Sequence, residues 1–98
     1  MKSIMEFDTT GMDFNSRMEL FRKTEPVKLN TYVFFSGDHT EGPSAVKVTE
    51  DNQQIISMFW NSIYFEDMKS AKRANDIARK KYYDYQADAA EGYLAEAM

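Results

Sequence analysis

The sequence predicts one α+β domain: an antiparallel meander of three to four strands, a short N-terminal helix, and a long C-terminal helix packed on one face of the sheet. The chain has 98 residues, which suits a single domain over residues 1–98. Its middle third is rich in β-branched and aromatic residues, which favour strands. In its last third, small and aromatic residues recur at helical spacing. These three observations define the fold class.

The N-terminal quarter predicts a weak strand and then a short helix. Apolar residues alternate over residues 3–7, as in a strand with one buried face. Asp13 is a typical cap for a helix over residues 13–24, and Pro26 ends this helix because proline disfavours helical geometry in the residue before it. Arg17 falls outside the apolar face of the helix, which consists of Phe14, Met18 and Phe21.

The middle of the chain predicts three strands joined by short connections. The strands cover residues 29–35, 45–49 and 54–63, each with a high content of β-branched or aromatic residues. A polar loop with two glycines and a proline, residues 36–43, separates the first two, and a turn at residues 50–52 separates the last two. Such short connections favour antiparallel pairing of consecutive strands, because a parallel partner would need a crossover of about a dozen residues or more.

The last third predicts a helix over residues 67–95. Asp67 is a plausible N-cap, and small and aromatic residues then recur in steps of three or four. We expect this stripe to pack on the sheet: Ala71, Ala74, Ala78, Tyr82, Tyr85, Ala89 and Tyr93.

Composition and motifs exclude most kinds of active site. The chain has no cysteine, so it offers no thiolate nucleophile, no disulfide and no Cys-based metal site. Its four glycines are scattered rather than grouped before a helix, which excludes a phosphate-binding loop. His39 stands alone in the polar loop, where a solvated side chain is the simplest interpretation. The sequence therefore predicts a protein that is not an enzyme and that carries no cofactor and no metal.

Charge and hydropathy restrict the partners and the compartment. The formal net charge of -4 and the pI of about 4.9 argue against attraction of the whole surface to nucleic-acid phosphates. The first residues lack the apolar run of a signal peptide, and no stretch approaches the roughly 18 apolar residues of a membrane span. We therefore expect a cytoplasmic protein without membrane contact.

Apolar residues occupy both faces of two predicted strands. A sheet covered on one side only should carry polar residues on its outer face. Here Leu29, Val33 and Phe35 oppose Tyr32 and Phe34, and Ile56, Met58 and Trp60 oppose Ile55, Phe59 and Ile63. One long helix covers one face, so the short helix, a second copy of the chain or another protein must cover the other.

These observations predict a small protein that binds another protein, itself as a homodimer, or both. The candidate binding residues are apolar or acidic: Tyr32, Phe34, Glu50, Asp51, Phe59, Asp84, Asp88 and Glu91. For the acidic ones, a solvated helix face and a turn are the alternative. In their general properties, small, acidic, cysteine-free domains with such a helix are similar to accessory proteins of bacteriophages and mobile elements, including inhibitors of host defence nucleases. The corresponding hypothesis is an anti-defence inhibitor that docks on a host factor such as a defence nuclease complex.

A second hypothesis is a small nucleic-acid-binding regulator. Its candidate residues lie on the side of the C-terminal helix away from the alanine stripe: Lys69, Lys72, Arg73 and Lys80. Asp76 lies on the same side and dilutes the positive field, so a solvated helix face remains the alternative.

Overall fold

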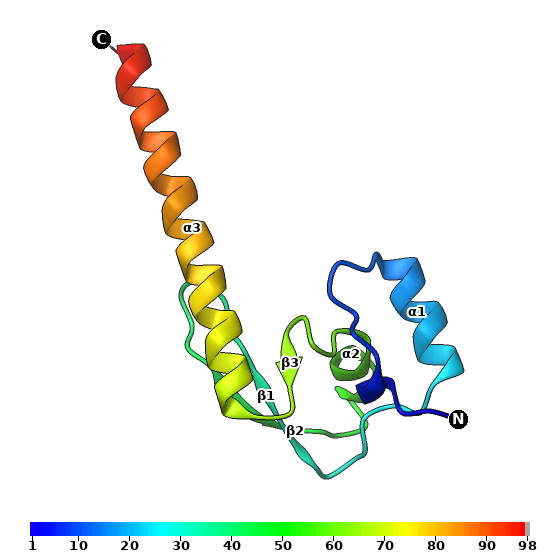
Figure 1. The fold of residues 1–98 in the computed structure, drawn as a ribbon. Coiled ribbons are helices and arrows are strands. Elements are labelled where there is room, and N and C mark those ends of the chain that lie inside the picture. Colours follow the sequence, from blue (N-terminus) through cyan, green and yellow to red (C-terminus); the bar gives the residue numbers. More distant parts are fainter. Residues whose placement is uncertain (98) are drawn as a thin grey trace.

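A computed structural model describes the backbone of residues 1–97 and the side chains of residues 1–89. It confirms the α+β class, with a three-stranded antiparallel sheet, a short N-terminal helix and a long C-terminal helix. Residues 1–67 form a body, and the last helix begins at its edge and extends away from it (Figure 1), so that the molecule measures 60 × 27 × 21 Å. The elements are η1 (Ile4–Glu6), α1 (Phe14–Lys23), β1 (Tyr32–Phe35), β2 (Ser44–Lys47), α2 (Gln53–Met58), β3 (Tyr64–Phe65) and α3 (Met68–Ala97).

The sheet has the order β2-β1-β3, so β1 is its central strand. Val33 pairs with Val46 of β2, and Phe34 pairs with Phe65 of β3, both in antiparallel register. The predicted meander places the second strand in the centre and is wrong on this point. The chain between β2 and β3 contains a helix, and this helix carries β3 across to the free edge of β1.

The strand predicted over residues 54–63 is a helix, α2, followed by turns. Thr49 donates its backbone N–H to the side-chain oxygen of Asn52 at 2.7 Å, which holds the turn that starts α2. Ile56 and Trp60, four residues apart, are both buried in the core. Because the apolar residues in this segment satisfy a period near four as well as a period of two, the pattern alone does not separate helix from strand.

The strand predicted over residues 3–7 is also wrong, because η1 replaces it. Ser3 accepts a hydrogen bond from the backbone N–H of Met5 at 3.2 Å, and Glu6 accepts one from the backbone N–H of Ser3 at 3.1 Å. This reciprocal capping box favours a helical turn over an extended chain. Only an isolated parallel bridge between Ser3 and Glu25 keeps strand-like pairing here.

The helix predicted over residues 13–24 is confirmed as α1, but its buried face is different. Asp13 caps it by accepting the backbone N–H of Ser16 at 2.7 Å. Arg17 is buried, whereas Phe14 is 62% exposed. The predicted apolar face is therefore wrong at Phe14, and Arg17 takes the inward position because several carbonyl and hydroxyl oxygens converge on its guanidinium.

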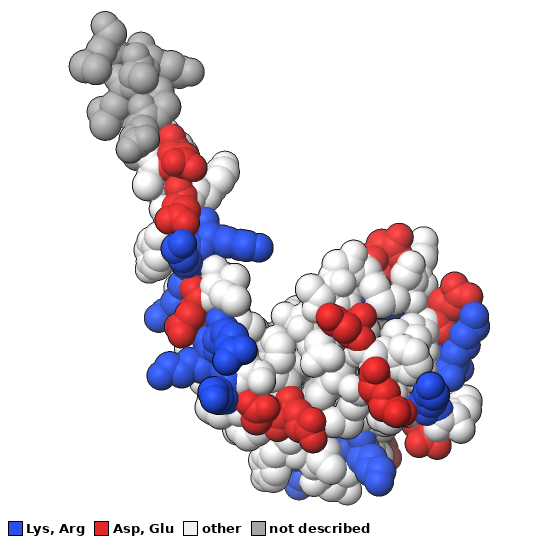
Figure 2. Space-filling view, viewed as in Figure 1, with Lys and Arg blue, Asp and Glu red and all other residues white. Residues whose placement is uncertain are grey.

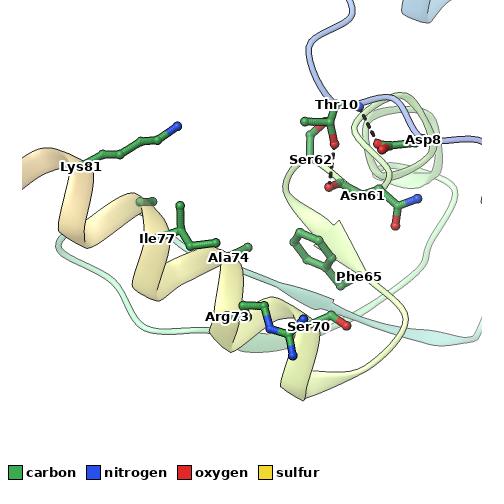
Figure 3. Close-up of a pocket in the computed structure, with 11 residues that line it drawn as sticks. Asp8, Thr10, Asn61, Ser62, Phe65, Ser70, Arg73, Ala74, Ile77 and Lys81 are labelled. Carbon is green, nitrogen blue, oxygen red and sulfur yellow. Dashed lines mark hydrogen bonds between the residues drawn. The ribbon is translucent and has the colours of Figure 1, made fainter.

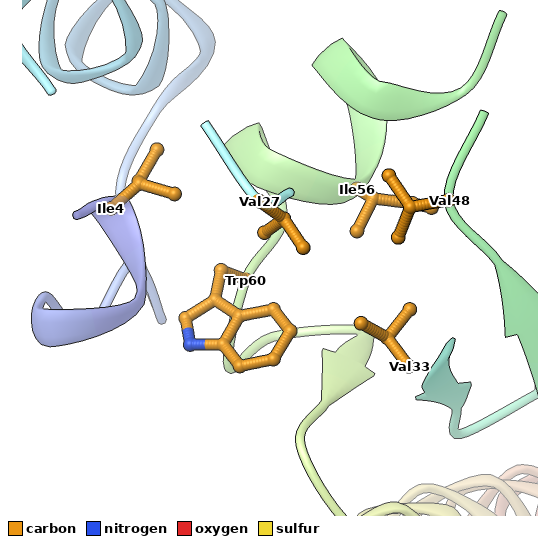
Figure 4. Packing of buried hydrophobic residues seen from close by; sticks show 6 residues of the cluster. All are labelled: Ile4, Val27, Val33, Val48, Ile56 and Trp60. Carbon is orange, nitrogen blue, oxygen red and sulfur yellow. The ribbon is translucent and has the colours of Figure 1, made fainter. Parts of the chain in front are cut away.

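One hydrophobic cluster lies between the Val33 side of the sheet and the elements η1 and α2. Six residues form its centre (Figure 4): Ile4, Val27, Val33, Val48, Ile56 and Trp60. Leu20 and Phe21 of α1 pack against this cluster. Full burial of one such aliphatic side chain contributes about 1.5–3 kcal/mol, so the cluster is the main source of stability in the body.

The first turns of α3 lie against β1 and β3, as predicted for one face of the sheet. Asp67 caps the helix by accepting the backbone N–H of Ser70 at 2.7 Å, and Ala71 is fully buried. Beyond these turns the predicted stripe leaves the sheet: Tyr85 is 70% exposed and Ala89 is exposed. Tyr93 lies outside the residues with described side chains.

The loop of residues 36–43 holds the first half of α3. Asn75 is buried, and its Nδ2 donates to the backbone oxygens of Asp38 at 3.0 Å and Glu41 at 2.9 Å. The loop needs a glycine at its start: Gly37 has φ +74, and a Cβ there would lie 2.8 Å from the backbone oxygen of Gly42. The hairpin loop and α3 are therefore joined by buried hydrogen bonds.

Candidate protein-docking surfaces

Two helices of the body form an apolar hollow on the surface, which we call the α1–α2 patch. It has a volume of about 260 Å³ and is lined by Phe14, Asp51, Gln54, Ile55, Met58 and Phe59. Phe14 is the first residue of α1, and Ile55 and Phe59 are four residues apart at the end of α2. Phe14 is 62% exposed and Ile55 is 50% exposed, so two large apolar side chains stand in water beside the hollow.

Arg17 supports the patch from below. Its guanidinium carbon lies 4.5 Å from the centroid of the Phe59 ring, within the range of a cation–π contact. The guanidinium group also donates four hydrogen bonds at 2.9–3.2 Å, to the backbone oxygens of Met12 and Met58 and to the hydroxyls of Thr9 and Ser62. Thr9 in turn donates to the backbone oxygen of Trp60. These bonds join α1, α2 and residues 9–12 into a rigid base for Phe59.

Acidic residues line the α1–α2 patch or neighbour its residues in the sequence. Asp51 lines it, Glu50 precedes Asp51 in the same turn, and Asp13 caps α1 next to Phe14; all three are exposed. Hydrogen bonds from the backbone N–H and the hydroxyl of Ser16 lower the pKa of Asp13, so this carboxylate keeps its charge in moderately acidic solution. The patch therefore combines an apolar floor with negative charge.

A second hollow, the α3 groove, lies between the body and the inner side of α3. Its volume is about 560 Å³. In Figure 3, Asp8, Thr10, Asn61 and Ser62 line the body side, Phe65 lies at the base, and Arg73, Ala74, Ile77 and Lys81 line the helix side. Ile77 is 53% exposed. On the body side, Thr10 donates its backbone N–H to Asp8 at 2.9 Å and its hydroxyl to the backbone oxygen of Asn61 at 3.2 Å.

The residues predicted for protein binding do not form one site. Asp51 and Phe59 meet in the α1–α2 patch, with Glu50 beside them. Tyr32 is 64% exposed and borders a separate hollow of about 370 Å³, and Phe34 is half-buried in β1. The acidic residues of the C-terminal helix lie on its projecting part: Asp84 and Asp88 are exposed, and the side chain of Glu91 lies outside the described residues.

Sequence reasoning missed Phe14 and Ile55, the two most exposed apolar side chains of the α1–α2 patch. The four-residue spacing of Ile55 and Phe59 is the signal that could have found the patch, because it places both on one face of a helix. The correction also moves most of the exposed apolar surface from the sheet to the helices. Tyr32 is on the sheet, and Met1 and Leu29 lie outside the helices and strands.

The residues predicted for nucleic-acid binding, Lys69, Lys72, Arg73 and Lys80, are all exposed on the first half of α3. Figure 2 shows Lys and Arg side chains gathered over this part of the helix. Arg73 lines the α3 groove rather than pointing away from the body. In the part of the chain with described side chains, the one ion pair joins Lys23 and Glu19 within α1, so these four cations have no carboxylate partner there.

His39 is not a solvated loop residue, contrary to the prediction. Its ring stacks on Tyr82 of α3 with 3.6 Å between centroids and 10° between planes, and it is partly buried. Within the described residues, no group of three or more His, Cys, Asp or Glu side chains is placed to hold a metal ion. Over the same residues, no helix combines the length and apolarity of a membrane span.

Comparisons with known proteins add no relative: no family model matches the chain, and neither the curated proteins nor the solved structures include a significant match. The surfaces are therefore interpreted from their own geometry and charge.

Proposed function

We propose that this protein is a small, non-enzymatic binding protein that docks on another protein through the α1–α2 patch. The observation that carries the proposal is the exposure of Phe14 and Ile55 beside a hollow with a well-supported floor. Isolated apolar side chains on a surface are ordinary, but a cluster of large ones around a concave site is typical of an anchor position in an interface.

The energetics of the patch support this role. Complete burial of a Phe or Ile side chain contributes about 1.5–3 kcal/mol, and Phe14 and Ile55 have about half of that still to gain. A partner side chain that fills the hollow would gain a similar amount. The guanidinium of Arg17, held by its hydrogen bonds, lies against the Phe59 ring before a partner arrives, which reduces the entropy lost on binding.

The charge around the patch indicates the chemistry of the partner. Asp13, Glu50 and Asp51 favour a segment in which an apolar side chain is flanked by Lys or Arg. The body as a whole has eleven acidic and six basic residues over positions 1–67. Occupation of a basic nucleic-acid groove on a host factor, such as a defence nuclease complex, is the form of inhibition that these charges fit, and a role as a phage or mobile-element accessory protein would follow from it.

The test compares two variants as baits in lysate of the organism that encodes the protein. The double substitution Phe14→Ser with Ile55→Glu should reduce recovery of the partner by about tenfold or more, because it removes the anchors and adds a charge. Tyr83→Ser is the matched control, since Tyr83 is 60% exposed but lies on α3, away from the patch. Unchanged thermal unfolding of both variants would establish that the fold is intact. Equal recovery with both baits, or no specific partner, contradicts the proposal.

A second candidate function is nucleic-acid binding by the first half of α3. It is favoured by six basic residues between positions 69 and 81 with no carboxylate partner among the described side chains. If four of them contact phosphates, affinity should fall about a hundredfold between 50 and 200 mM salt. Gel-shift titrations at these two concentrations test it, with Lys72→Gln and Lys80→Gln expected to weaken binding and to flatten the salt dependence. Absence of a complex at low salt eliminates this candidate.

A further inference from the structure

We propose that α3 pairs antiparallel with α3 of a second copy of this chain, so that the basic first half of each helix lies along the acidic second half of the other. This self-association uses a surface separate from the α1–α2 patch and goes beyond the docking function.

The charges of α3 are segregated along its length. Residues 68–81 contain six Lys or Arg and one acidic residue, Asp76, whereas residues 82–98 contain four acidic residues and no Lys or Arg. The acidic residues of the second half are Asp84, Asp88, Glu91 and Glu96. In an antiparallel pair, each block faces the opposite charge of the other helix, and in a parallel pair, each block faces its own kind. Charge complementarity therefore selects a second copy as the occupant and the antiparallel direction.

This distribution opposes the dipole of the helix itself. The N-terminus of a helix is its positive end and favours acidic residues, and the C-terminus favours basic ones. The first turn of α3 has no acidic residue and the last turn no basic one, although Asp67 caps the N-terminus. The segregated charges thus weaken an isolated helix, whereas an antiparallel neighbour offers opposite charges and an oppositely directed dipole.

Residues 83–89 of α3 also lack support from the body. Residues 83–89 are all exposed, with Tyr83 at 60% and Tyr85 at 70%, and Figure 2 shows this part of the helix standing clear of the body. A helical segment of about a dozen residues is marginal in water on its own, so its stability requires packing against another surface.

The groove side of α3 supplies a self-complementary surface. Ala74, Ile77 and Lys81 line the groove, and steps of three and four continue this stripe to Asp84, Tyr85 and Asp88. A two-fold axis between positions 84 and 85 sets Lys81 of each copy opposite Asp88 of the other. The acidic end of one helix then runs toward the α3 groove of the other.

The groove is suited to receive such an acidic segment. Arg73 and Lys81 stand on its helix side, with the apolar surface of Phe65, Ala74 and Ile77 between the charged ends (Figure 3). Asp8 is the one carboxylate that lines it, on the body side, against the two cations Arg73 and Lys81 on the helix side. Its volume of about 560 Å³ leaves room for side chains of a second helix.

Charge exchange tests the pairing. Light scattering on the wild-type chain at about 100 µM should give twice the 11.4 kDa mass of one chain. Lys81→Glu and Asp88→Lys should each weaken self-association by about tenfold or more, because each substitution sets like charges opposite one another at two places. A mixture of the two single variants should recover dimer, since Glu at 81 then faces Lys at 88 and Asp88 faces Lys81. A monomeric wild type, or no recovery on mixing, overturns the proposal.

Cross-linking fixes the direction. The chain has no cysteine, so Tyr85→Cys and Ala78→Cys each introduce a unique thiol, seven residues apart on the same side of the helix. The antiparallel pair predicts a disulfide between copies at position 85 and none at position 78, where the two thiols would be about 20 Å apart. Cross-linking at both positions indicates a parallel pair and contradicts the proposal, as does cross-linking at neither. The Phe14→Ser and Ile55→Glu variant should keep the dimer mass, so loss of docking and loss of pairing are separate results.

Discussion

The body and the second half of α3 differ in how far their apolar and polar side chains are buried. In the body, Trp60 and its neighbours are buried, and among the described residues no buried side-chain nitrogen or oxygen lacks a hydrogen-bond partner. In α3 beyond Tyr82, every described side chain is exposed, and tyrosines alternate with carboxylates. The contrast teaches that the body has its own packed core, whereas the described side chains of the second half of α3 have no core to pack against.

The largest expected effect on stability comes from a substitution in the core of the body. Trp60→Ala should lower the free energy of unfolding by about 3–5 kcal/mol, because Trp60 is 2% exposed and packs against the rest of the core cluster. Chemical denaturation followed by circular dichroism measures it. Tyr83→Ala, which removes an exposed aromatic ring, should change the same quantity by less than about 0.5 kcal/mol in a dilute monomer. Similar losses in both variants would show that the division into two regions is wrong.

The next effect concerns the base of the α1–α2 patch. Arg17→Met should cost about 2–4 kcal/mol, because it leaves buried oxygens of Thr9 and Met58 without their donor. Arg22→Met is the control on the same helix, since Arg22 is exposed and should contribute little. Both values come from denaturation curves. An Arg17 variant as stable as the control would show that the patch has no rigid support.

A substitution at Asn75 tests how firmly α3 is attached to the body. Asn75→Ala should cost about 1–3 kcal/mol locally, because the backbone oxygens of Asp38 and Glu41 lose their shared donor. Hydrogen exchange in α3 should accelerate by about tenfold or more, while amides of the core cluster stay protected. Asp76→Ala, at the exposed neighbouring position, should leave exchange unchanged. Equal acceleration in core and helix would mean that α3 and the body unfold as one unit.

The smallest effect is a pH dependence at the start of α3. Hydrogen bonds from the backbone N–H and the hydroxyl of Ser70 lower the pKa of Asp67 below its ordinary value of 3.8. A lowered folded-state pKa means that the cap stabilises the helix fully above about pH 4 and loses this contribution as the pH falls through the folded-state value. Asp67→Asn keeps a capping side chain that does not titrate, so its helicity by circular dichroism should fall less between pH 5 and pH 2. An identical pH profile for both proteins would exclude Asp67 as a titrating cap.

The sequence was most informative where the hydrophobic periodicity and an N-cap residue indicate the same helix. Asp13 and Asp67 each precede a long periodic run, and both helices begin where these residues predict. It was misleading where two periods fit the same residues, as in α2, and where a capping box competes with alternation, as at Ser3. The burial of Arg17 could not be predicted, because the oxygens that receive its hydrogen bonds come from residues 9–12, Met58 and Ser62, which only the folded chain brings together. The α1–α2 patch was predicted only in part for the same reason. Glu50 and Asp51 are adjacent in the sequence and were predicted, whereas Phe14 and Ile55 come from two different helices and were missed.

Gly37 affects how α3 is held against the body. The space that a methyl group would occupy at this position is filled by the backbone oxygens of Glu41 and Gly42. A side chain here would require the loop backbone to shift, and this loop carries the two backbone oxygens that accept hydrogen bonds from Asn75. A position without a side chain thus helps to hold the 30-residue helix α3 against the hairpin loop.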